Sequence, residues 1–265
     1  MSTAVYVVTG ATGALGRAIV RALAGPASRH IVLAGRSESA LAEVAAALPG
    51  DSPAHIVAGA DAAQPAHEAD AIVARLRDVV AAAQSPSGAL HLTLVQCSGT
   101  LGDLSRSVDQ YAPDEIAAYT TANFVSFATL AARFLAFAKG TAAERIAVVN
   151  ISSLLAIEPF ANWGLYAATR AARDQLMRVA ALEHAADPRV KTLSYAPGPL
   201  EGSMQATVRA TLADPAQRDL YVTMHKDGKL VSPDHSARLV CDLVHAWDFE
   251  SGAHIDIYDL APPQD

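Results

Sequence analysis

Three polar side chains in the second half of the chain have the types and spacing for proton transfer to a carbonyl group. Tyr166 follows Ser153 by thirteen residues, and Arg170 follows Tyr166 by four. Residues four apart share one face of a helix, so Tyr166 and Arg170 are expected to point into one cleft. A phenol near a cation can donate a proton to a carbonyl oxygen that a second hydroxyl holds in place. Taken alone, the spacing also fits an ordinary packed tyrosine.

A glycine-rich turn near the N-terminus has the pattern that binds a dinucleotide. Thr9-Gly10-Ala11-Thr12-Gly13-Ala14-Leu15-Gly16 joins an apolar run to a helical stretch. Glycine is required where backbone turns sharply or approaches a pyrophosphate, and the helix N-terminus offers free N–H groups to phosphates. The turn predicts cofactor contacts at Gly10, Thr12, Gly13, Leu15, Gly16 and Arg17. A purely structural glycine turn is the alternative.

The residue after the second apolar run indicates which dinucleotide is bound. An acidic residue there would bind the ribose 2′-hydroxyl of NAD, but Arg36 follows the run, with Ser37 next to it. Together with Arg17, these donors suit the 2′-phosphate of NADP. The sequence therefore predicts NADP(H), unless both arginines are solvated surface charges.

These residues need a scaffold, and the sequence predicts an α/β fold with a doubly wound, Rossmann-like parallel sheet. Nearly continuous apolar runs alternate with alanine-rich helical patterns, as in a parallel sheet covered on both faces. Strands are expected at 4–9, 30–34, 55–57, 90–97, 145–151, 190–195 and 254–258, with helices at 14–23, 39–48, 66–83, 114–139 and 165–184. Ser232-Pro233 is expected to open one more helix, with Ser232 as N-cap. Residues 1–265 are predicted to form one domain, with a lid over 198–230.

Composition excludes several classes of protein. Hydrophobic residues make up 51% of the 265 residues and charged residues 18%, which argues against disorder. The net charge of −7 argues against a nucleic-acid partner. Cys97 and Cys241 are expected to be reduced thiols, and no histidine has metal-ligand spacing. With no secretory signal and no uncharged apolar run of membrane-span length, a cytoplasmic protein without metal or membrane partner is expected.

The fold pattern with Ser153 and Tyr166 resembles the short-chain dehydrogenase/reductase family over nearly the whole chain. Within that family, several stretches resemble the sepiapterin reductase branch. They are Leu101–Ser105, Asn150–Leu154, Pro159-Phe160, Trp163, Ala171–Asp174, Tyr195–Leu200, Met204-Gln205, Gly228–Val231 and Ser251–Asp256. The late stretches are the specific ones, because most short-chain reductases lack them.

The resemblance implies a role for each matching residue. Tyr166 would donate the proton, Ser153 would orient the carbonyl, Arg170 would take the place of the family's lysine, and Asn123 would help hold a water in the proton relay. Further cofactor contacts are implied at Asp61, Gly99, Pro197, Gly198 and Leu200, and further substrate contacts at Met204 and Asp256. The Asp256 carboxylate would anchor the guanidine-like edge of a pterin; without the resemblance it would be read as a surface or salt-bridged group.

Two segments depart from the family pattern. Arg170 replaces the lysine, and an arginine is bulkier and a poor member of a proton relay. Gln96-Cys97-Ser98-Gly99 replaces the usual Asn-Asn-Ala-Gly.

The leading hypothesis is an NADPH-dependent reductase of the keto side chain of a pterin. The alternatives are a general reductase of dicarbonyls and an NADP-binding regulatory protein without turnover. The family usually pairs through helices that correspond to 114–139 and 165–184, so a homodimer or homotetramer is expected.

Overall fold

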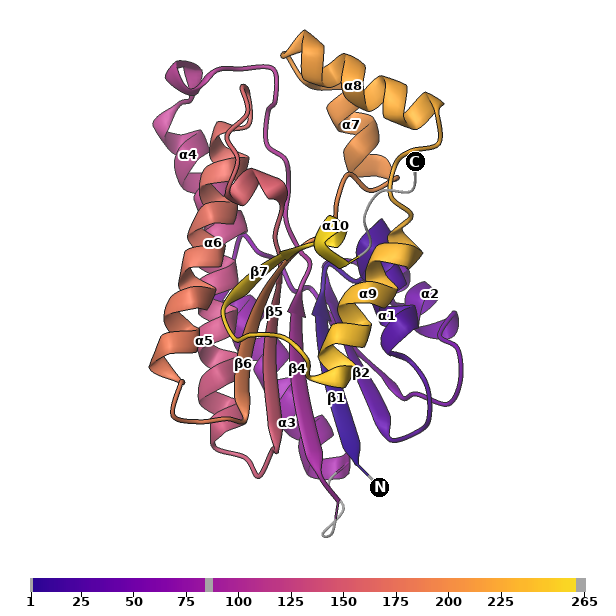
Figure 1. Ribbon diagram of the computed structural model, residues 1–265. Helices are drawn as coiled ribbons and strands as arrows, with labels where there is room; N and C mark the ends of the chain where they lie inside the picture. Colours follow the sequence, from indigo (N-terminus) through magenta and orange to yellow (C-terminus); the bar gives the residue numbers. More distant parts are fainter. Residues whose placement is uncertain (1, 84–87, 261–265) are drawn as a thin grey trace.

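The fold is organised around one seven-stranded parallel sheet, seen in a computed structural model that describes residues 2–83 and 88–260 (Figure 1). The strand order is β3-β2-β1-β4-β5-β6-β7. The strands are β1 (Thr3–Thr9), β2 (Arg29–Gly35), β3 (Ala54–Ala58), β4 (Leu90–Gln96), β5 (Arg145–Ile151), β6 (Val190–Ala196) and β7 (Ala253–Asp256). The order reverses between β1 and β4, and open sheets of this kind bind ligands at the carboxyl ends of the strands beside that point.

Helices cover both faces of the sheet (Figure 1). Alternate side chains of each strand enter opposite cores: Val5 and Val7 of β1 join one cluster, while Tyr6 and Val8 join the other. The helices are α1 (Ala14–Leu23), α2 (Glu38–Ala46), α3 (Pro65–Ala83), α4 (Pro113–Thr120), α5 (Ser126–Lys139), α6 (Gly164–Glu183), α7 (Ser203–Thr211), α8 (Pro215–Lys226), α9 (Pro233–Ala246) and α10 (Ile257–Leu260). Helices α3 and α5 pack on one face, and α1 and α9 on the other. The predicted doubly wound sheet is confirmed.

The predicted elements differ from the structure at a few places. The last strand ends at Asp256 rather than Tyr258, because Ile257 begins the short helix α10. The expected helix 114–139 is divided into α4 and α5 by a π-helical turn, Thr121–Val125. Ser232 does precede α9, but its side chain makes no capping hydrogen bond. The predicted domain 1–265 includes residues 1, 84–87 and 261–265, which lie outside the described part of the chain.

One helical stretch of the described residues, Pro113–Lys139, is long and apolar enough to cross a membrane by length and composition, with a mean hydropathy of 1.3. In the structure this stretch is α4, the π-helical turn and α5. Phe127, Leu130 and Phe134 of α5 are buried in the core beside the sheet. Packing inside the fold therefore accounts for the apolar residues on the buried side of α5.

Helices α7 and α8 rise above the carboxyl ends of the strands, within the segment 198–230 that the sequence predicts as a lid (Figure 1). Val208 and Leu212 of this segment are buried in a third apolar cluster with Leu104, Trp163 and Tyr166. The segment is therefore packed against the end of the sheet where the candidate site residues lie.

Candidate active site

The glycine turn after β1 has the geometry that a dinucleotide phosphate needs. Gly10 has a φ of 64°, and a Cβ there would lie 2.9 Å from the backbone nitrogen of Ser98. A Cβ on Gly16 would lie 2.1 Å from the carbonyl oxygen of Gly10. Gly13 is the N-cap of α1 and provides no side-chain cap, so the first N–H groups of α1 are left for an anion. The residues of this turn therefore fit a bound dinucleotide.

Of the two arginines expected near the 2′-phosphate, Arg17 is bonded to the glycine turn, whereas Arg36 is exposed at the end of β2. Arg17 is held by a hydrogen bond from its Nε to the carbonyl oxygen of Thr12, at 2.9 Å. Arg36 is exposed and has no carboxylate within 4.0 Å among the described residues. Ser37 caps α2 by accepting a hydrogen bond from the N–H of Ala40 at 3.3 Å. An exposed guanidinium and an exposed serine hydroxyl therefore lie next to each other at the end of β2.

Asp61 follows β3 at the same edge of the sheet. Its Oδ1 accepts a hydrogen bond from the N–H of Ala63 at 3.1 Å, and its carbonyl oxygen accepts one from the N–H of Gln64. These bonds fix the turn before α3. The side chain is half-buried, which leaves part of the carboxylate accessible at the expected adenine end.

Tyr166 and Ser153 come from neighbouring elements at the carboxyl end of β5. Ser153 follows the strand, and its Oγ accepts a hydrogen bond from the N–H of Leu155 at 3.2 Å, which leaves the hydroxyl hydrogen to donate elsewhere. Tyr166 lies in the first turns of α6 and is 8% exposed. Its ring is packed edge-on against Trp163, with 5.5 Å between the ring centroids. The phenol is thus fixed in place by packing.

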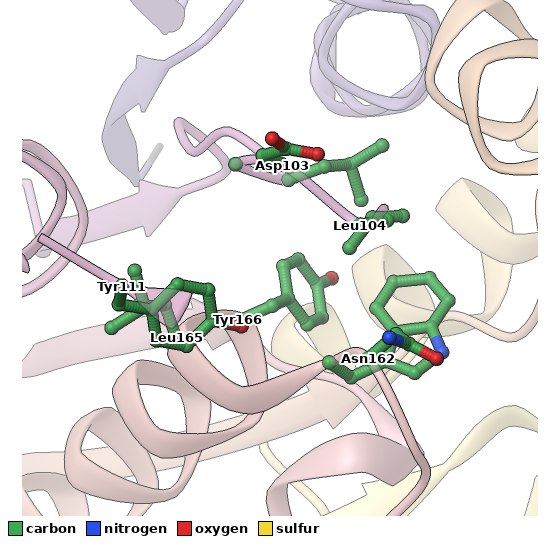
Figure 2. Close-up of a pocket in the computed structure, with 9 residues that line it drawn as sticks. Asp103, Leu104, Tyr111, Asn162, Leu165 and Tyr166 are labelled. Atoms are coloured by element: carbon green, nitrogen blue, oxygen red, sulfur yellow. The ribbon is translucent and has the colours of Figure 1, made fainter. Parts of the chain in front are cut away.

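A narrow surface recess borders Tyr166 and, in this conformation, has no room for a water molecule. Figure 2 shows the Tyr166 ring facing the loop that carries Asp103 and Leu104. The lining is mostly apolar or aromatic and consists of Leu101, Gly102, Asp103, Leu104, Tyr111, Asn162, Trp163, Leu165 and Tyr166. Of the expected substrate contacts, Tyr166 lines this pocket, whereas Ser153, Met204 and Asp256 do not.

The lid segment is attached directly to the pocket walls. Trp163 donates a hydrogen bond from its Nε1 to Gln217 of α8 at 3.1 Å. The N–H of Ala213 bonds the carbonyl oxygen of Leu104 at 3.0 Å. Tyr221 of α8 packs against the same apolar cluster, and its pKa is raised by burial first and then by Tyr166 and Tyr258. The segment that contains α7 and α8 therefore contacts both the loop of Leu104 and the start of α6.

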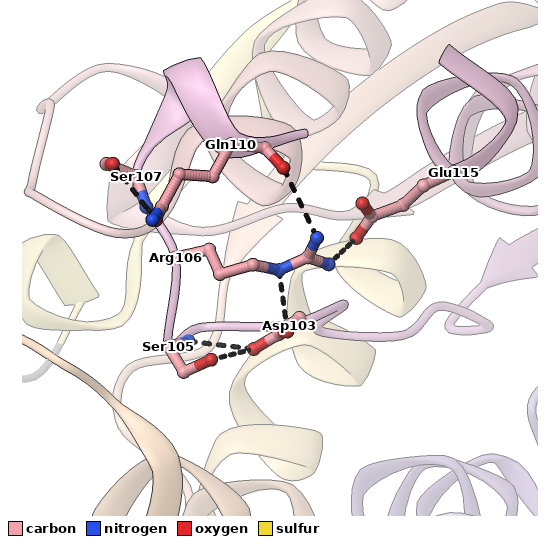
Figure 3. A network of polar contacts seen from close by, with 6 residues as sticks. All are labelled: Asp103, Ser105, Arg106, Ser107, Gln110 and Glu115. Atoms are coloured by element: carbon pink, nitrogen blue, oxygen red, sulfur yellow. Dashed lines mark hydrogen bonds and ion pairs between the residues drawn. The ribbon is translucent and has the colours of Figure 1, made fainter. Parts of the chain in front are cut away.

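The loop that carries Asp103 and Leu104 is held in place by a network of ion pairs and hydrogen bonds around Arg106 (Figure 3). Arg106 bonds Asp103 through its Nε at 2.8 Å and bonds Glu115 at the start of α4 through Nη2. Asp103 also accepts hydrogen bonds from the hydroxyl and the N–H of Ser105, which lower the pKa of its carboxyl together with the smaller effect of Arg106. These bonds fix one wall of the pocket before any substrate arrives.

Arg170 lies against the face of Tyr166, as the four-residue spacing predicts. Its Cζ is 4.8 Å from the centroid of the Tyr166 ring, and its Nη1 donates to the carbonyl oxygen of Ile151 at 2.7 Å. The guanidinium is 5% exposed and lies where a side chain on residue 99 would be: a Cβ on Gly99 would be 2.6 Å from its Nη2. The larger cation therefore fits because residue 99 is glycine.

A second arginine, Arg173, lies one turn of α6 further on and is 1% exposed. It donates through Nε to the carbonyl oxygen of Asn123 and through Nη1 to that of Ser98, at 3.2 Å. Its Cζ lies 4.8 Å from the centroid of the Phe127 ring. Burial first, and then the charge of Arg170, hold the pKa of Arg173 well below its usual range.

Asn123 lies in the π-helical turn and has all its polar groups bonded to protein. Its Oδ1 accepts from the N–H of Thr100 at 2.8 Å, and its Nδ2 donates to the Thr100 hydroxyl and to the carbonyl oxygen of Tyr119. Its own carbonyl oxygen accepts from Arg173. The implied water-holding role of Asn123 stays a prediction, since in this conformation Arg173 occupies that carbonyl.

Behind the pocket, Asp174 of α6 is bonded to β5, to the residue just after β5, and to β7. It is 2% exposed and accepts hydrogen bonds from Ser152 at 2.6 Å and from Asn150 at 2.8 Å. His254 of β7 lies with its Nδ1 2.6 Å from the other carboxylate oxygen. These contacts fix the end of β5, and hence Ser153, against α6.

Asp256 lies at the end of β7, paired in register with Ala196, beside the turn of Pro197 and Gly198. Its Oδ1 accepts from the N–H of Tyr258 at 3.0 Å, and no cation lies within 4.0 Å of it among the described residues. The salt-bridged alternative is therefore not what the structure contains.

The turn after β6 carries the remaining expected contacts. Gly198 has a φ of 77°, and a Cβ there would lie 3.0 Å from Ile257 and from Val231. Leu200 forms a parallel bridge with Val231, and Met204 on α7 is 43% exposed. All these residues lie at the end of the sheet that also carries the glycine turn, as expected, although they do not line the pocket beside Tyr166. In the part of the chain that the structure describes, no cluster of three or more His, Cys, Asp or Glu is placed to hold a metal ion.

The contacts of some residues of this site could not be predicted from the sequence. Arg173 and Asp174 fall within a stretch that supports the family resemblance, but their partners lie 50 and 22 residues away. Trp163 also supported the resemblance, whereas its bond to Gln217 crosses 54 residues. Such pairings follow from the fold and cannot be found from local spacing.

The sheet order, the glycine turn and the Ser153–Tyr166 pair define a nucleotide-binding oxidoreductase fold. The short chain dehydrogenase family pattern matches residues 4–213, and the chain belongs to the short-chain dehydrogenase/reductase family of oxidoreductases. It is 38% identical over 266 residues to the sepiapterin reductase of Meriones unguiculatus, covering 98% of both chains.

Two further proteins are similar over different lengths. The chain is 32% identical over 112 residues to a benzil reductase of Bacillus cereus that forms (S)-benzoin, covering 42% of this chain and 45% of that one. Its fold matches the structure of L-sorbose reductase from Gluconobacter frateurii complexed with NADPH and L-sorbose, with a TM-score of 0.77 and 21% identity over 97% of this chain and 95% of the other.

Proposed function

We propose that this protein is an NADPH-dependent carbonyl reductase that reduces the keto side chain of a pterin. The proposal rests mainly on the phenol of Tyr166. Its ring is packed against Trp163, borders the recess and has the guanidinium of Arg170 over its face. The pterin substrate is supported by the near full-length similarity to sepiapterin reductase.

The residues around Tyr166 have separate parts in the proposed reaction. A nicotinamide cofactor supplies the hydride to the carbonyl carbon when it is bound at the glycine turn. The Tyr166 phenol donates its proton to the carbonyl oxygen, which becomes the hydroxyl of the product. The Ser153 hydroxyl accepts a hydrogen bond from the N–H of Leu155, and its own O–H is free to donate a hydrogen bond to that same oxygen. Arg170 keeps a fixed positive charge beside the ring.

The preference for NADPH is supported by Arg17 and Arg36. Arg17 lies in the first turns of α1 and Arg36 directly follows β2, and the residue after β2 that would bind the ribose of NAD is not acidic. The related fold of an enzyme complexed with NADPH agrees with this preference. Arg36 is exposed and ready to bind a 2′-phosphate through two parallel hydrogen bonds.

The pterin anchor is assigned to Asp256. Its carboxylate lacks a cationic partner among the described residues and lies beside the Pro197–Gly198 turn. A carboxylate can accept two hydrogen bonds from the guanidine-like edge of a pterin ring. A simple diketone offers no such donors, so Asp256 should distinguish the two substrate classes.

The test is NADPH oxidation by the purified protein with sepiapterin and benzil assayed side by side. We expect faster turnover of sepiapterin, and we expect Asp256→Ala to lower that turnover at least about tenfold while leaving benzil reduction nearly unchanged. Asp248→Ala, an exposed carboxylate elsewhere, is the matched control. Equal losses on both substrates would remove the anchor. NADPH binding without turnover of either compound would favour the regulatory alternative.

A second candidate is a general reductase of aromatic diketones. It is favoured by the apolar and aromatic lining next to Tyr166 and by the partial similarity to benzil reductase. In the same assay it predicts activity on benzil that exceeds activity on sepiapterin and that does not respond to Asp256→Ala.

We also propose that the chain forms a homodimer or homotetramer through α5 and α6. Val125 beside α5 and Val179 and Leu182 of α6 are large apolar side chains that are 41%, 37% and 77% exposed. Apolar exposure on two long neighbouring helices favours pairing with a second copy. Light scattering gives the mass, and Leu182→Glu should shift it towards the monomer.

A further inference from the structure

A second cavity lies at the amino ends of the strands, the opposite end of the sheet from the glycine turn. It has a volume of about 300 Å³ and lies between the amino ends of β1, β4 and β5 and the carboxyl end of α9. Ala4 and Tyr6 of β1 line the cavity and the glycine turn begins at Gly10, so the nearest part of the cavity lies roughly 13 Å along the strand from the turn. A ligand here would therefore not touch the proposed catalytic residues.

Two arginines line the cavity without a carboxylate partner. Arg29 donates through Nη1 to the carbonyl oxygen of Leu23 at 3.4 Å, and Arg145 donates through Nη1 to that of His245 at 3.2 Å. No carboxylate oxygen lies within 4.0 Å of either guanidinium in residues 2–83 and 88–260. Each guanidinium has five N–H donors, so most of them remain for a ligand.

Trp247 forms a rigid wall of this cavity. Its φ of 60° is in the left-handed region, which is rare for a bulky residue and is tolerated only where the surroundings hold it. Arg145 lies 5.4 Å from its ring centroid and Lys191 5.3 Å. Lys191 also donates to the Trp247 carbonyl oxygen at 3.0 Å. The cations thus hold this wall in place.

Among the described residues, the lining of this cavity includes no carboxylate, and Asp242 and Glu144 act on its histidines from outside the lining. The pKa of His245 is lowered by burial and then by Arg29, and Asp242 opposes this. The pKa of His91 is lowered by burial and then by Arg145, and Glu144 opposes this. Both histidines are therefore mainly neutral at pH 7, and the cavity is positive because of its arginines.

We propose that this cavity binds a small polyanion that carries carboxylate or phosphate groups. The planar fork of arginine matches both groups through two parallel hydrogen bonds. The volume is at the lower end of the range for small-molecule sites, which fits a compact ligand. This site is separate from the nicotinamide site and does not depend on the proposed activity.

Isothermal titration with citrate and with inorganic phosphate, at constant ionic strength, tests the proposal. Saturating NADPH is added so that the anion cannot bind at the glycine turn. We expect saturable binding of at least one probe and at least about tenfold weaker binding in Arg29→Gln and Arg145→Gln. Arg133→Gln should bind as the native protein does, because Arg133 is paired with Asp70 on the surface. Binding of citrate alone would identify carboxylates as the ligand class, and binding of phosphate alone would identify phosphates.

A second readout guards against misfolded variants. In the native protein, anion binding should raise the pKa of His91 and His245 in an NMR titration, whereas that of His235, at the other end of α9, should not change. The absence of saturable binding, or equal affinity in the Arg29, Arg145 and Arg133 variants, would overturn the proposal. So would binding that leaves both cavity histidines unchanged.

Discussion

Replacing Gly99 by alanine should impair the reaction by moving Arg170. The added Cβ would lie 2.6 Å from Nη2 of Arg170 and 3.3 Å from Oδ1 of Asn123. The end of an arginine usually yields to such a contact, but this guanidinium is 5% exposed and is bonded to the carbonyl oxygen of Ile151 at 2.7 Å. To reach ordinary contact it must move by roughly 1 Å, and a displacement of that size in a catalytic site can cost up to about a hundredfold in rate.

The expected effect is therefore a decrease in kcat/KM of about tenfold to a hundredfold, or about 1.4–2.7 kcal/mol in activation free energy. Steady-state NADPH oxidation measures it, and thermal unfolding confirms that the variant is folded. Gly140→Ala is the matched control, since Gly140 has a φ of −77° at the end of α5 and its Cβ would come no closer than 3.4 Å to another atom, the carbonyl oxygen of Phe137.

A double-mutant cycle separates this steric cause from a general loss of structure. Lysine at position 170 lacks Nη2, so Gly99→Ala combined with Arg170→Lys should lose less activity than the product of the two single effects. A coupling of at least about 1 kcal/mol is expected for groups in direct contact. Purely multiplicative losses, or near-native activity in Gly99→Ala, would refute the view that Gly99 makes room for the guanidinium.

Three further predictions concern single side chains. Tyr166→Phe should lower kcat at least about a hundredfold while NADPH still binds, because it removes the proton donor, and a near-normal rate would exclude Tyr166 from the mechanism. Arg36→Asp should weaken NADPH relative to NADH, and an unchanged preference in cofactor titrations would disprove the 2′-phosphate contact. Burial raises the pKa of the Glu68 carboxyl in the folded protein above its value in the unfolded chain. The contribution of Glu68 to the stability of the fold is therefore fully present below the unfolded pKa, and it is lost as the pH rises through the folded pKa. Glu68→Gln should thus raise the melting temperature at pH 8 more than at pH 4, and an equal change at both would contradict the ionisation argument.

The sequence predicted the sheet well because the central strands are buried on both faces. Strand 145–151, for example, has the apolar run 146–149 at its centre, and parallel pairing follows from the helices between the strands. The predicted end of the last strand was wrong, because Ile257 and Tyr258 have the composition of a strand although they belong to α10. Asp256 and Asp259 instead bond the backbone around them and turn the chain into α10.

The glycine turn and the Tyr166–Arg170 pair could also be predicted, since both depend on local geometry. Gly16 is required by its close approach to Gly10 and Gly10 by its positive φ of 64°, and a four-residue spacing on a helix is sufficient to bring Arg170 to Tyr166. The pocket lining could not be predicted in this way. It is completed by Leu101 and Leu104, and the latter is bonded to the lid at Ala213 through contacts that only the folded chain brings together.

The two departures from the family pattern are connected in the structure. Arg173 donates to the carbonyl oxygen of Ser98, within the altered Gln96–Gly99 segment, and to that of Asn123. Arg170 fills the space over Gly99 at the end of the same segment. Burying two guanidinium groups together is costly unless their donors are satisfied, and backbone carbonyls of β5, of the segment after β4 and of the π-helical turn supply acceptors. The altered segment and the arginine at position 170 therefore form one arrangement that keeps a fixed cation against the Tyr166 ring, so neither change by itself argues for a loss of turnover.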